Sequence, residues 1–135
     1  MTAIDPETQR IFDLQADILR VLANPKRLMI MQVLGGGAKT VTQIAAALDM
    51  SLQNTSQHLR VMKDQGIVNA QRDGQSVGYR LTNPVFSECC ELTRKALTEE
   101  MHKRGQDLAR AEAAYPMPTE WTLIAQPNAG SSLIT

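Results

Sequence analysis

The segment from Ser51 to Gly66, SLQNTSQHLRVMKDQG, is rich in side chains that can hydrogen-bond to the bases of DNA. Amides, a hydroxyl and a guanidinium gather in its first ten residues, at Gln53, Asn54, Ser56, Gln57 and Arg60. In the major groove, asparagine and glutamine pair with adenine, and arginine pairs with guanine. The segment therefore predicts a base-reading surface. The alternative is a polar face that has no partner.

The same segment has the signals of a helix that docks on a core. Ser51 can cap its N-terminus, and Gly66 can end it because glycine accepts the left-handed backbone of a C-cap. A second set of side chains recurs at helical spacing, at Leu52, Thr55, Leu59 and Met62. We expect that set to pack on the core and the polar set to face outward. His58 is expected to be structural or phosphate-facing rather than a metal ligand.

Two strand-like segments follow at residues 67–72 and 77–82, with the turn signal Asp73-Gly74 between them. We expect a loop from Asp73 to Ser76, somewhat longer than a two-residue turn. A hairpin directly behind a base-reading helix is a wing, which approaches the DNA backbone or the minor groove. The side chains expected to act there are Arg72, Gln75 and Arg80. The alternative for the two arginines is that they serve solubility.

Two adjacent thiols, Cys89 and Cys90, are the candidates for sensing chemistry. Neighbours on a helix point about 100° apart, so an intact helix holds them poorly for a disulfide with each other. They could be packing residues, a redox or reactive-sulfur switch, or ligands of a soft thiophile such as a trivalent arsenical. Glu88 and Glu91 should raise the thiol pKa values and the helix N-terminus should lower them, a balance the sequence leaves open.

The remaining elements are helices. Asp5-Pro6 and Asn24-Pro25 each signal a helix start, Gly35 ends the second helix, and Thr40 begins a third that ends near Leu48. A broad apolar stripe predicts a last helix from residue 85 to about 115. The expected fold is mainly α with a β-hairpin wing, in the order α-α-α-α-β-β-α, dimerising through the first and last helices. Residues 1–115 would form this domain and residues 116–135 a Pro/Gly/Ser-rich tail.

Charge is segregated along the 135-residue chain, although its formal net charge is zero. Residues 20–80 hold eight basic and three acidic side chains, a net charge of +5, between acidic ends of −3 and −2. This pattern is typical of a chain that meets phosphate on one face. Enzyme classes find no support, because there is no glycine-rich phosphate loop, nucleophile elbow or metal-ligand cluster. With no apolar run of membrane length and only two cysteines, we expect a protein of the reducing cytoplasm.

Residues 18–101 resemble the ArsR/SmtB family of bacterial winged helix-turn-helix repressors. The segments that carry the resemblance are residues 22–28 (LANPKRL), 44–48 (IAAAL), 56–62 (SQHLRVM) and 66–68 (GIV). It implies a homodimer that binds duplex DNA at an inverted-repeat operator, with an inducer that shifts the dimer to a weakly binding conformation. It also places Gln53, Asn54, Ser56, Gln57 and Arg60 in the recognition helix and Arg72, Gln75 and Arg80 in the wing.

The chain departs from this family at the sensor positions. The family's cysteine pair aligns with Thr40 and Thr42, and its zinc site on the last helix has no match, since His102 lacks a histidine partner. We therefore expect no cofactor and no metal, unless Cys89 and Cys90 bind a thiophile. The predicted function is a DNA-binding regulator, expected to be a repressor, released by thiol chemistry. The alternative is an inducer-independent winged-helix module for protein interaction, with purely structural cysteines.

Overall fold

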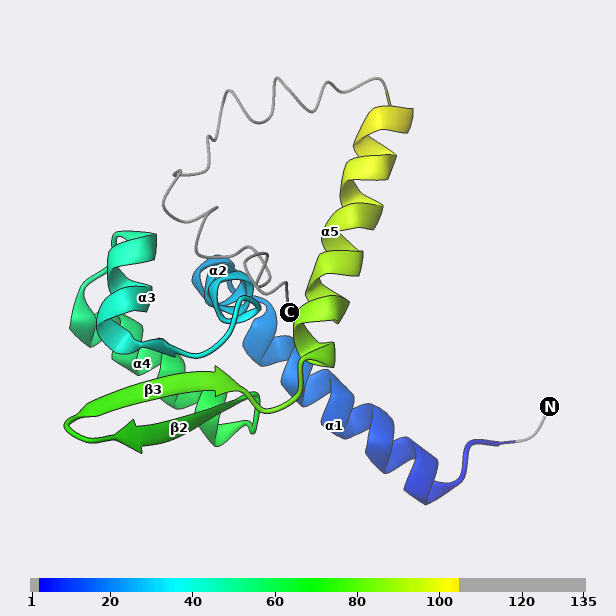
Figure 1. Cartoon of the computed structure of the whole chain (residues 1–135). Helices are drawn as coiled ribbons and strands as arrows, with labels where there is room; N and C mark the ends of the chain where they lie inside the picture. Colours follow the sequence, from blue (N-terminus) through cyan, green and yellow to red (C-terminus); the bar gives the residue numbers. More distant parts are fainter. Residues whose placement is uncertain (1–2, 105–135) are drawn as a thin grey trace.

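The computed structural model describes residues 3–104 and shows the expected helices with a small sheet (Figure 1). The predicted tail at residues 116–135, and the predicted continuation of the last helix to residue 115, lie outside this range. Among the described residues, no helix is both long and apolar enough to cross a membrane.

The first two helices begin where an Asx-Pro pair predicts a start. Asp5 caps α1 (Pro6–Leu22), accepting a hydrogen bond from the Thr8 amide at 2.9 Å, which lowers the pKa of the Asp5 carboxyl. Asn24 caps α2 (Pro25–Leu34) in the same way. Proline follows each cap at the first helical position, where its missing N–H costs nothing. Both predicted starts are confirmed.

A helix-turn-helix follows. The predicted capping box opens α3 (Val41–Leu48), with reciprocal hydrogen bonds between Thr40 and Gln43. Asp49 then adopts the left-handed backbone, with φ of 52°, and this reversal lets α4 (Leu52–Asp64) begin three residues later. Ser51 caps α4 through the Asn54 amide at 3.0 Å, as predicted. Gly66, with φ of +81°, follows its last turn.

The sheet has three antiparallel strands in the order β1-β3-β2, one more than expected. The hairpin strands are β2 (Val68–Asp73) and β3 (Ser76–Leu81), and β1 (Lys39–Thr40) pairs with the outer edge of β3. The predicted loop length was wrong. Asp73 pairs with Ser76, so Gly74 and Gln75 alone form a two-residue loop, with Gly74 supplying a φ of +66°.

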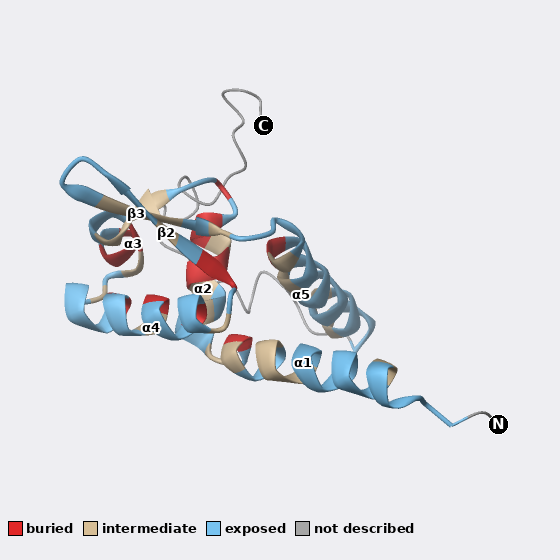
Figure 2. Cartoon of the chain, turned by 90° about the horizontal axis from the view of Figure 1, so that it is seen from below, coloured by how far each residue is buried: buried red, intermediate tan, exposed pale blue. Residues whose placement is uncertain are grey.

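The core lies where α2, α3 and α4 meet the base of the hairpin (Figure 2). Ile30, Met31, Ile44, Leu59, Met62 and Ile67 are fully buried in it. Only the C-terminal part of α1 reaches this core, through the buried Leu22 and the partly buried Ile18 and Val21. One prediction for α4 was wrong: Leu52 does not pack, and its exposed fraction is 55%. The helix starts one turn beyond the edge of the core.

The last helix, α5 (Val85–Lys103), leaves the domain as an arm and contacts it mainly along α2 (Figure 1). Phe86 and Cys90 pack against the core near its start. Large apolar side chains stay exposed along α1 and α5: Ile11, Phe12, Leu14 and Leu19 on the first, and Val85, Leu92 and Leu97 on the second. These two helices expose more apolar surface than is usual for a small monomeric domain.

Candidate nucleic-acid interface and thiol cavity

Helix α4 has a buried face and an exposed polar face. Thr55, Leu59 and Met62 have no exposed surface and hold the helix on the core. All five predicted base-reading side chains are exposed: Gln53, Asn54, Ser56, Gln57 and Arg60. Within residues 3–104, none of these five side chains hydrogen-bonds to another residue. The exposed face therefore keeps its donors and acceptors available for a ligand.

Two sets of hydrogen bonds fix the position of α4. At its start, the Thr55 hydroxyl donates to the Ser51 carbonyl at 2.8 Å, in addition to the Ser51 cap. Further along, Arg27 Nε of α2 donates to His58 Nδ1 at 3.2 Å, and Arg27 Nη1 donates to the Val21 carbonyl of α1 at 3.1 Å. One guanidinium thus joins three helices, so the structural reading of His58 is confirmed.

The environment of His58 favours its neutral form. Burial, and then the charges of Arg27 and Lys26, lower the pKa of His58 below its ordinary value. Because Arg27 Nε is the donor, His58 Nδ1 must be unprotonated to accept. The role of Arg27 was missed from the sequence, since the two side chains are 31 positions apart and no local pattern links them.

The hairpin carries the three predicted wing residues, all exposed, but does not bring them together. Cross-strand partners share a face, and Arg72 pairs with Val77 whereas Arg80 pairs with Asn69. Side chains alternate between the two faces along a strand. Arg72 therefore lies on the same face of the hairpin as Val77, Tyr79 and Leu81, and Arg80 lies on the opposite face. Gln75 lies in the loop at the tip. The two arginines can therefore meet different parts of one partner.

The sheet also brings Lys39 to the wing, which the sequence did not predict. Lys39 pairs with Tyr79 of β3 and lines a polar cavity of about 440 Å³ together with Arg72 and Ser76. Partial burial lowers the pKa of the Lys39 ammonium. The wing thus has a third cation on its β1 side.

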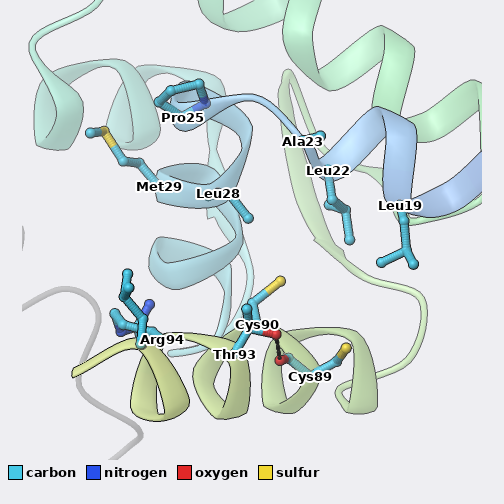
Figure 3. A pocket seen from close by; sticks show the side chains of 11 residues that line it. Leu19, Leu22, Ala23, Pro25, Leu28, Met29, Cys89, Cys90, Thr93 and Arg94 are labelled. Atoms are coloured by element: carbon cyan, nitrogen blue, oxygen red, sulfur yellow. Dashed lines mark hydrogen bonds between the residues drawn. The ribbon is translucent and has the colours of Figure 1, made fainter. Parts of the chain in front are cut away.

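The two cysteines line one apolar cavity of about 520 Å³ between α5 and the corner where α1 meets α2 (Figure 3). The other lining residues are Leu19, Leu22, Ala23, Pro25, Leu28, Met29, Thr93, Arg94 and Leu97. Figure 3 shows the two sulfur atoms pointing in different directions, as expected for neighbours on a helix. This volume lies in the range of small-molecule sites and is larger than a bare ion needs.

The two thiols differ in their environment. Cys89 is exposed, so of the three readings the one in which both cysteines are packing residues does not fit this thiol in the single chain. Cys90 is half-buried, and burial raises the pKa of its thiol, with smaller contributions in the same direction from Cys89 and Glu91. The Arg94 guanidinium opposes this shift. Burial, and not the balance between the flanking glutamates and the helix N-terminus, therefore favours the protonated and less reactive form of the Cys90 thiol.

Neither thiol belongs to a larger ligand set. Within residues 3–104, no group of three or more histidine, cysteine, aspartate or glutamate side chains could hold a metal ion. Arg94 instead ties the cavity rim to α2, donating to Gln32 Oε1 at 2.7 Å. The cavity therefore offers two thiols, apolar walls and one cation.

Comparison with known proteins identifies the chain's family. A family model described as a helix-turn-helix domain matches residues 22–71. The HTH-type transcriptional regulator Rv0081 of Mycobacterium tuberculosis is 30% identical over 100 residues, covering 73% of this chain and 87% of that protein. The HTH-type transcriptional repressor SmtB of the same species is 35% identical over 78 residues, 58% of each chain. The chain belongs to the ArsR/SmtB family of transcriptional regulators.

Solved structures in this family have the same fold. The homodimeric winged helix-turn-helix DNA-binding domain of Mb0332 from Mycobacterium bovis, a possible ArsR-family regulator, superposes with a TM-score of 0.67 at 28% identity. The match covers 76% of this chain and 95% of that one. The chain is thus a winged helix-turn-helix transcriptional regulator with a DNA-binding domain. It groups with regulators rather than with enzymes or with interaction modules that never touch DNA.

Proposed function

We propose that the chain is a homodimeric repressor whose α4 helices read the two halves of an inverted-repeat operator. The observation that carries this is the exposed face of α4, where five side chains make no hydrogen bond to any other residue between positions 3 and 104. An α-helix fits the major groove, and the N-terminal residues of a recognition helix contact base edges there. Gln53, Asn54, Gln57 and Arg60 are assigned to bases, and Ser56 to a base or phosphate.

The wing supplies the contacts that do not depend on base sequence. Arg72 and Arg80, on opposite faces of the hairpin, are assigned to phosphates on the two sides of the minor groove, and Gln75 at the tip to the groove itself. Phosphate contacts fix the register of the protein on the duplex without reading its sequence. The net charge of +5 between residues 20 and 80 supports this assignment.

Dimerisation through α1 and α5 explains the apolar side chains that these helices leave in water. In a twofold-symmetric dimer, the exposed apolar stripe of one chain would pack against the same stripe of its partner. A symmetric dimer presents two recognition helices, and half-sites one helical turn of DNA apart then give the operator inverted-repeat symmetry. The Mb0332 domain is homodimeric, which supports a dimer for this chain as well.

Thiol chemistry at the cavity is proposed to release the operator. A mono-organic trivalent arsenical has one bond to carbon and two to hydroxyl groups. The Cys89 and Cys90 thiols would displace these hydroxyl groups as two water molecules, which takes up the thiol protons, while the organic group enters the apolar cavity. An oxidant would instead take two electrons from two thiols and join cysteines of the two chains. Either change would push α5 against the α1–α2 corner. There, Arg27 links Val21 of α1 to His58 of the recognition helix.

The test is duplex binding to the chain's own upstream promoter region. Reduced protein, peroxide- or polysulfide-treated protein and protein with a trivalent arsenical are compared, each beside the Cys89→Ser/Cys90→Ser variant. Release of wild type by one treatment, with the variant still bound, identifies the thiols as the sensor and names their chemistry. If every sample stays bound, the thiols are packing residues and the release mechanism is wrong. If no sample binds, the operator-binding role itself is wrong.

A further inference from the structure

Leu52 is an apolar side chain at the start of a helix whose exposed face is mostly polar, with Val61 as its other exposed apolar residue. It is the first residue of α4 and its exposed fraction is 55%, while Thr55, Leu59 and Met62 of the same helix are fully buried. Scattered exposed leucines are ordinary on protein surfaces. This one differs because it stands beside Gln53 and Asn54, at the end of the recognition helix that meets base edges.

Three hydrogen bonds to Ser51 hold the backbone at Leu52. Ser51, just before it, accepts hydrogen bonds from the Asn54 amide at its hydroxyl, from the Thr55 amide at its carbonyl at 3.0 Å, and from the Thr55 hydroxyl at that carbonyl. Thr55 is itself fully buried. The Leu52 side chain is therefore held outward by a fixed helix end, so little conformational entropy of the backbone is lost when a partner covers it.

The chemistry of the major groove restricts what can cover such a side chain. Bases present donors and acceptors there, and the C5-methyl group of thymine is the apolar group among them. We infer that Leu52 packs against a thymine methyl in each operator half-site and so helps to choose thymine at that position. The inference rests on the proposed base-reading role of α4 and adds an apolar contact to its hydrogen bonds.

The size of the effect follows from the surface that the contact buries. Burying one methyl-sized apolar group stabilises the complex by about 0.8 kcal/mol. This corresponds to about fourfold tighter binding per half-site. Replacing thymine by uracil removes the methyl alone and leaves every hydrogen-bonding group of the base pair in place. The contact can therefore be probed from the DNA side without changing the hydrogen bonds that α4 makes.

The experiment starts from an operator selected with the full wild-type chain out of random duplex. Each thymine in a half-site is then replaced by uracil, and dissociation constants are measured for wild type and for Leu52→Ala. We expect one thymine whose replacement weakens wild type about fourfold and leaves Leu52→Ala unchanged. Val61→Ala, which shortens the other exposed apolar side chain of α4, is the matched control and should keep the uracil penalty.

Two results would overturn the inference. In the first, no replacement of thymine by uracil changes the affinity of the wild-type protein. In the second, a replacement weakens binding of Leu52→Ala as much as binding of the wild type. Both leave the operator-binding role intact, because the operator is still bound. If the selection yields no preferred duplex, the base-reading role fails, and the Leu52 contact fails with it. Equal unfolding temperatures for wild type and Leu52→Ala, expected for an exposed side chain, check that the variant is folded.

Discussion

At the scale of single residues, the base-reading assignment is most directly examined at Arg60. Its guanidinium is exposed on α4, one turn after Ser56 and Gln57, and within residues 3–104 it forms no ion pair. A free guanidinium can donate two parallel hydrogen bonds to guanine O6 and N7. A lysine such as Lys63 cannot make this pair of hydrogen bonds, because its ammonium group lacks the planar arrangement of donors in a guanidinium.

Arg60→Ala should lower affinity for the preferred operator by about 1–3 kcal/mol and relax the base preference at one position of each half-site. Binding isotherms on duplexes in which each base pair is changed in turn measure both effects. Lys63→Ala, which removes a cation from the same helix, serves as the control and should weaken all duplexes alike. An equal loss on every sequence for Arg60→Ala would assign Arg60 to phosphate instead.

His58 gives the stability a pH dependence. In the folded chain its pKa lies below the ordinary value, so the unfolded chain binds a proton first as the pH falls. The stabilising contribution is therefore complete above about pH 6.5, the unfolded value, and is lost as the pH falls from there through the lower folded pKa. Protonated His58 can no longer accept the hydrogen bond from Arg27.

His58→Leu should remove this pH dependence and lower the free energy of unfolding at pH 8 by about 1–2 kcal/mol, since a charged donor loses its acceptor. His58→Asn places an oxygen near the position of Nδ1 and should lose less. Urea unfolding at pH 8 and pH 5.5 measures both terms. A wild-type chain equally stable at both pH values would show that the Arg27–His58 contact does not control the titration.

At the scale of elements, the local signals predicted the helices well and the non-local contacts poorly. Asx-Pro pairs and the Thr40–Gln43 box act within four residues, so the starts of α1, α2 and α3 could be read directly. Strand β1 could not, because its two residues are strands only through their pairing with β3. Leu52 lies at the helical spacing of the packing face. Periodicity predicts which face of a helix a residue occupies, but not how far the core extends along that face.

The candidate site shows the same division. The exposure of the five polar side chains on α4 was predicted, because a polar face with buried Thr55, Leu59 and Met62 behind it is a property of one helix. The separation of Arg72 and Arg80 onto opposite faces depends on the register of the hairpin, which the two-residue loop sets. The expected longer loop left that register undefined.

The wing prediction follows from this geometry. Arg72→Ala and Arg80→Ala should each weaken binding to all duplexes by a similar factor and reduce the slope of log K against log salt by about 1. Titrations between 50 and 300 mM salt, on operator and on scrambled duplex, provide the slopes. Since the two side chains lie on opposite faces, the double variant should show an additive change of about 2. A base preference altered by either change would contradict the phosphate assignment.

At the scale of the whole molecule, the exposed apolar stripes on α1 and α5 require a partner. Phe12 and Leu92 are 53% and 64% exposed in the single chain, and both belong to arms that extend from the core. The thiol cavity lies between these same arms, at the α1–α2 corner. A change in how α5 lies against this corner would therefore alter the spacing of two recognition helices in a dimer, which is how a distant site can release DNA.

Leu92→Glu should convert the dimer to a monomer and abolish tight operator binding, because a carboxylate would be buried without a partner at the twofold interface. Sedimentation equilibrium and operator titration give the two readouts. Leu52→Glu puts the same charge on α4, away from both arms, and should stay a dimer. A Leu92→Glu variant that remains dimeric would move the interface elsewhere.

Under the proposed function, two chains read the two half-sites of one operator. The most direct measurement is the stoichiometry and affinity of reduced wild-type protein on an inverted-repeat duplex from its own promoter, beside a duplex with one half-site scrambled. We expect two chains per duplex and an affinity at least about tenfold weaker after scrambling, since one recognition helix then meets the wrong bases. One chain per duplex, or equal affinity for both duplexes, would contradict it.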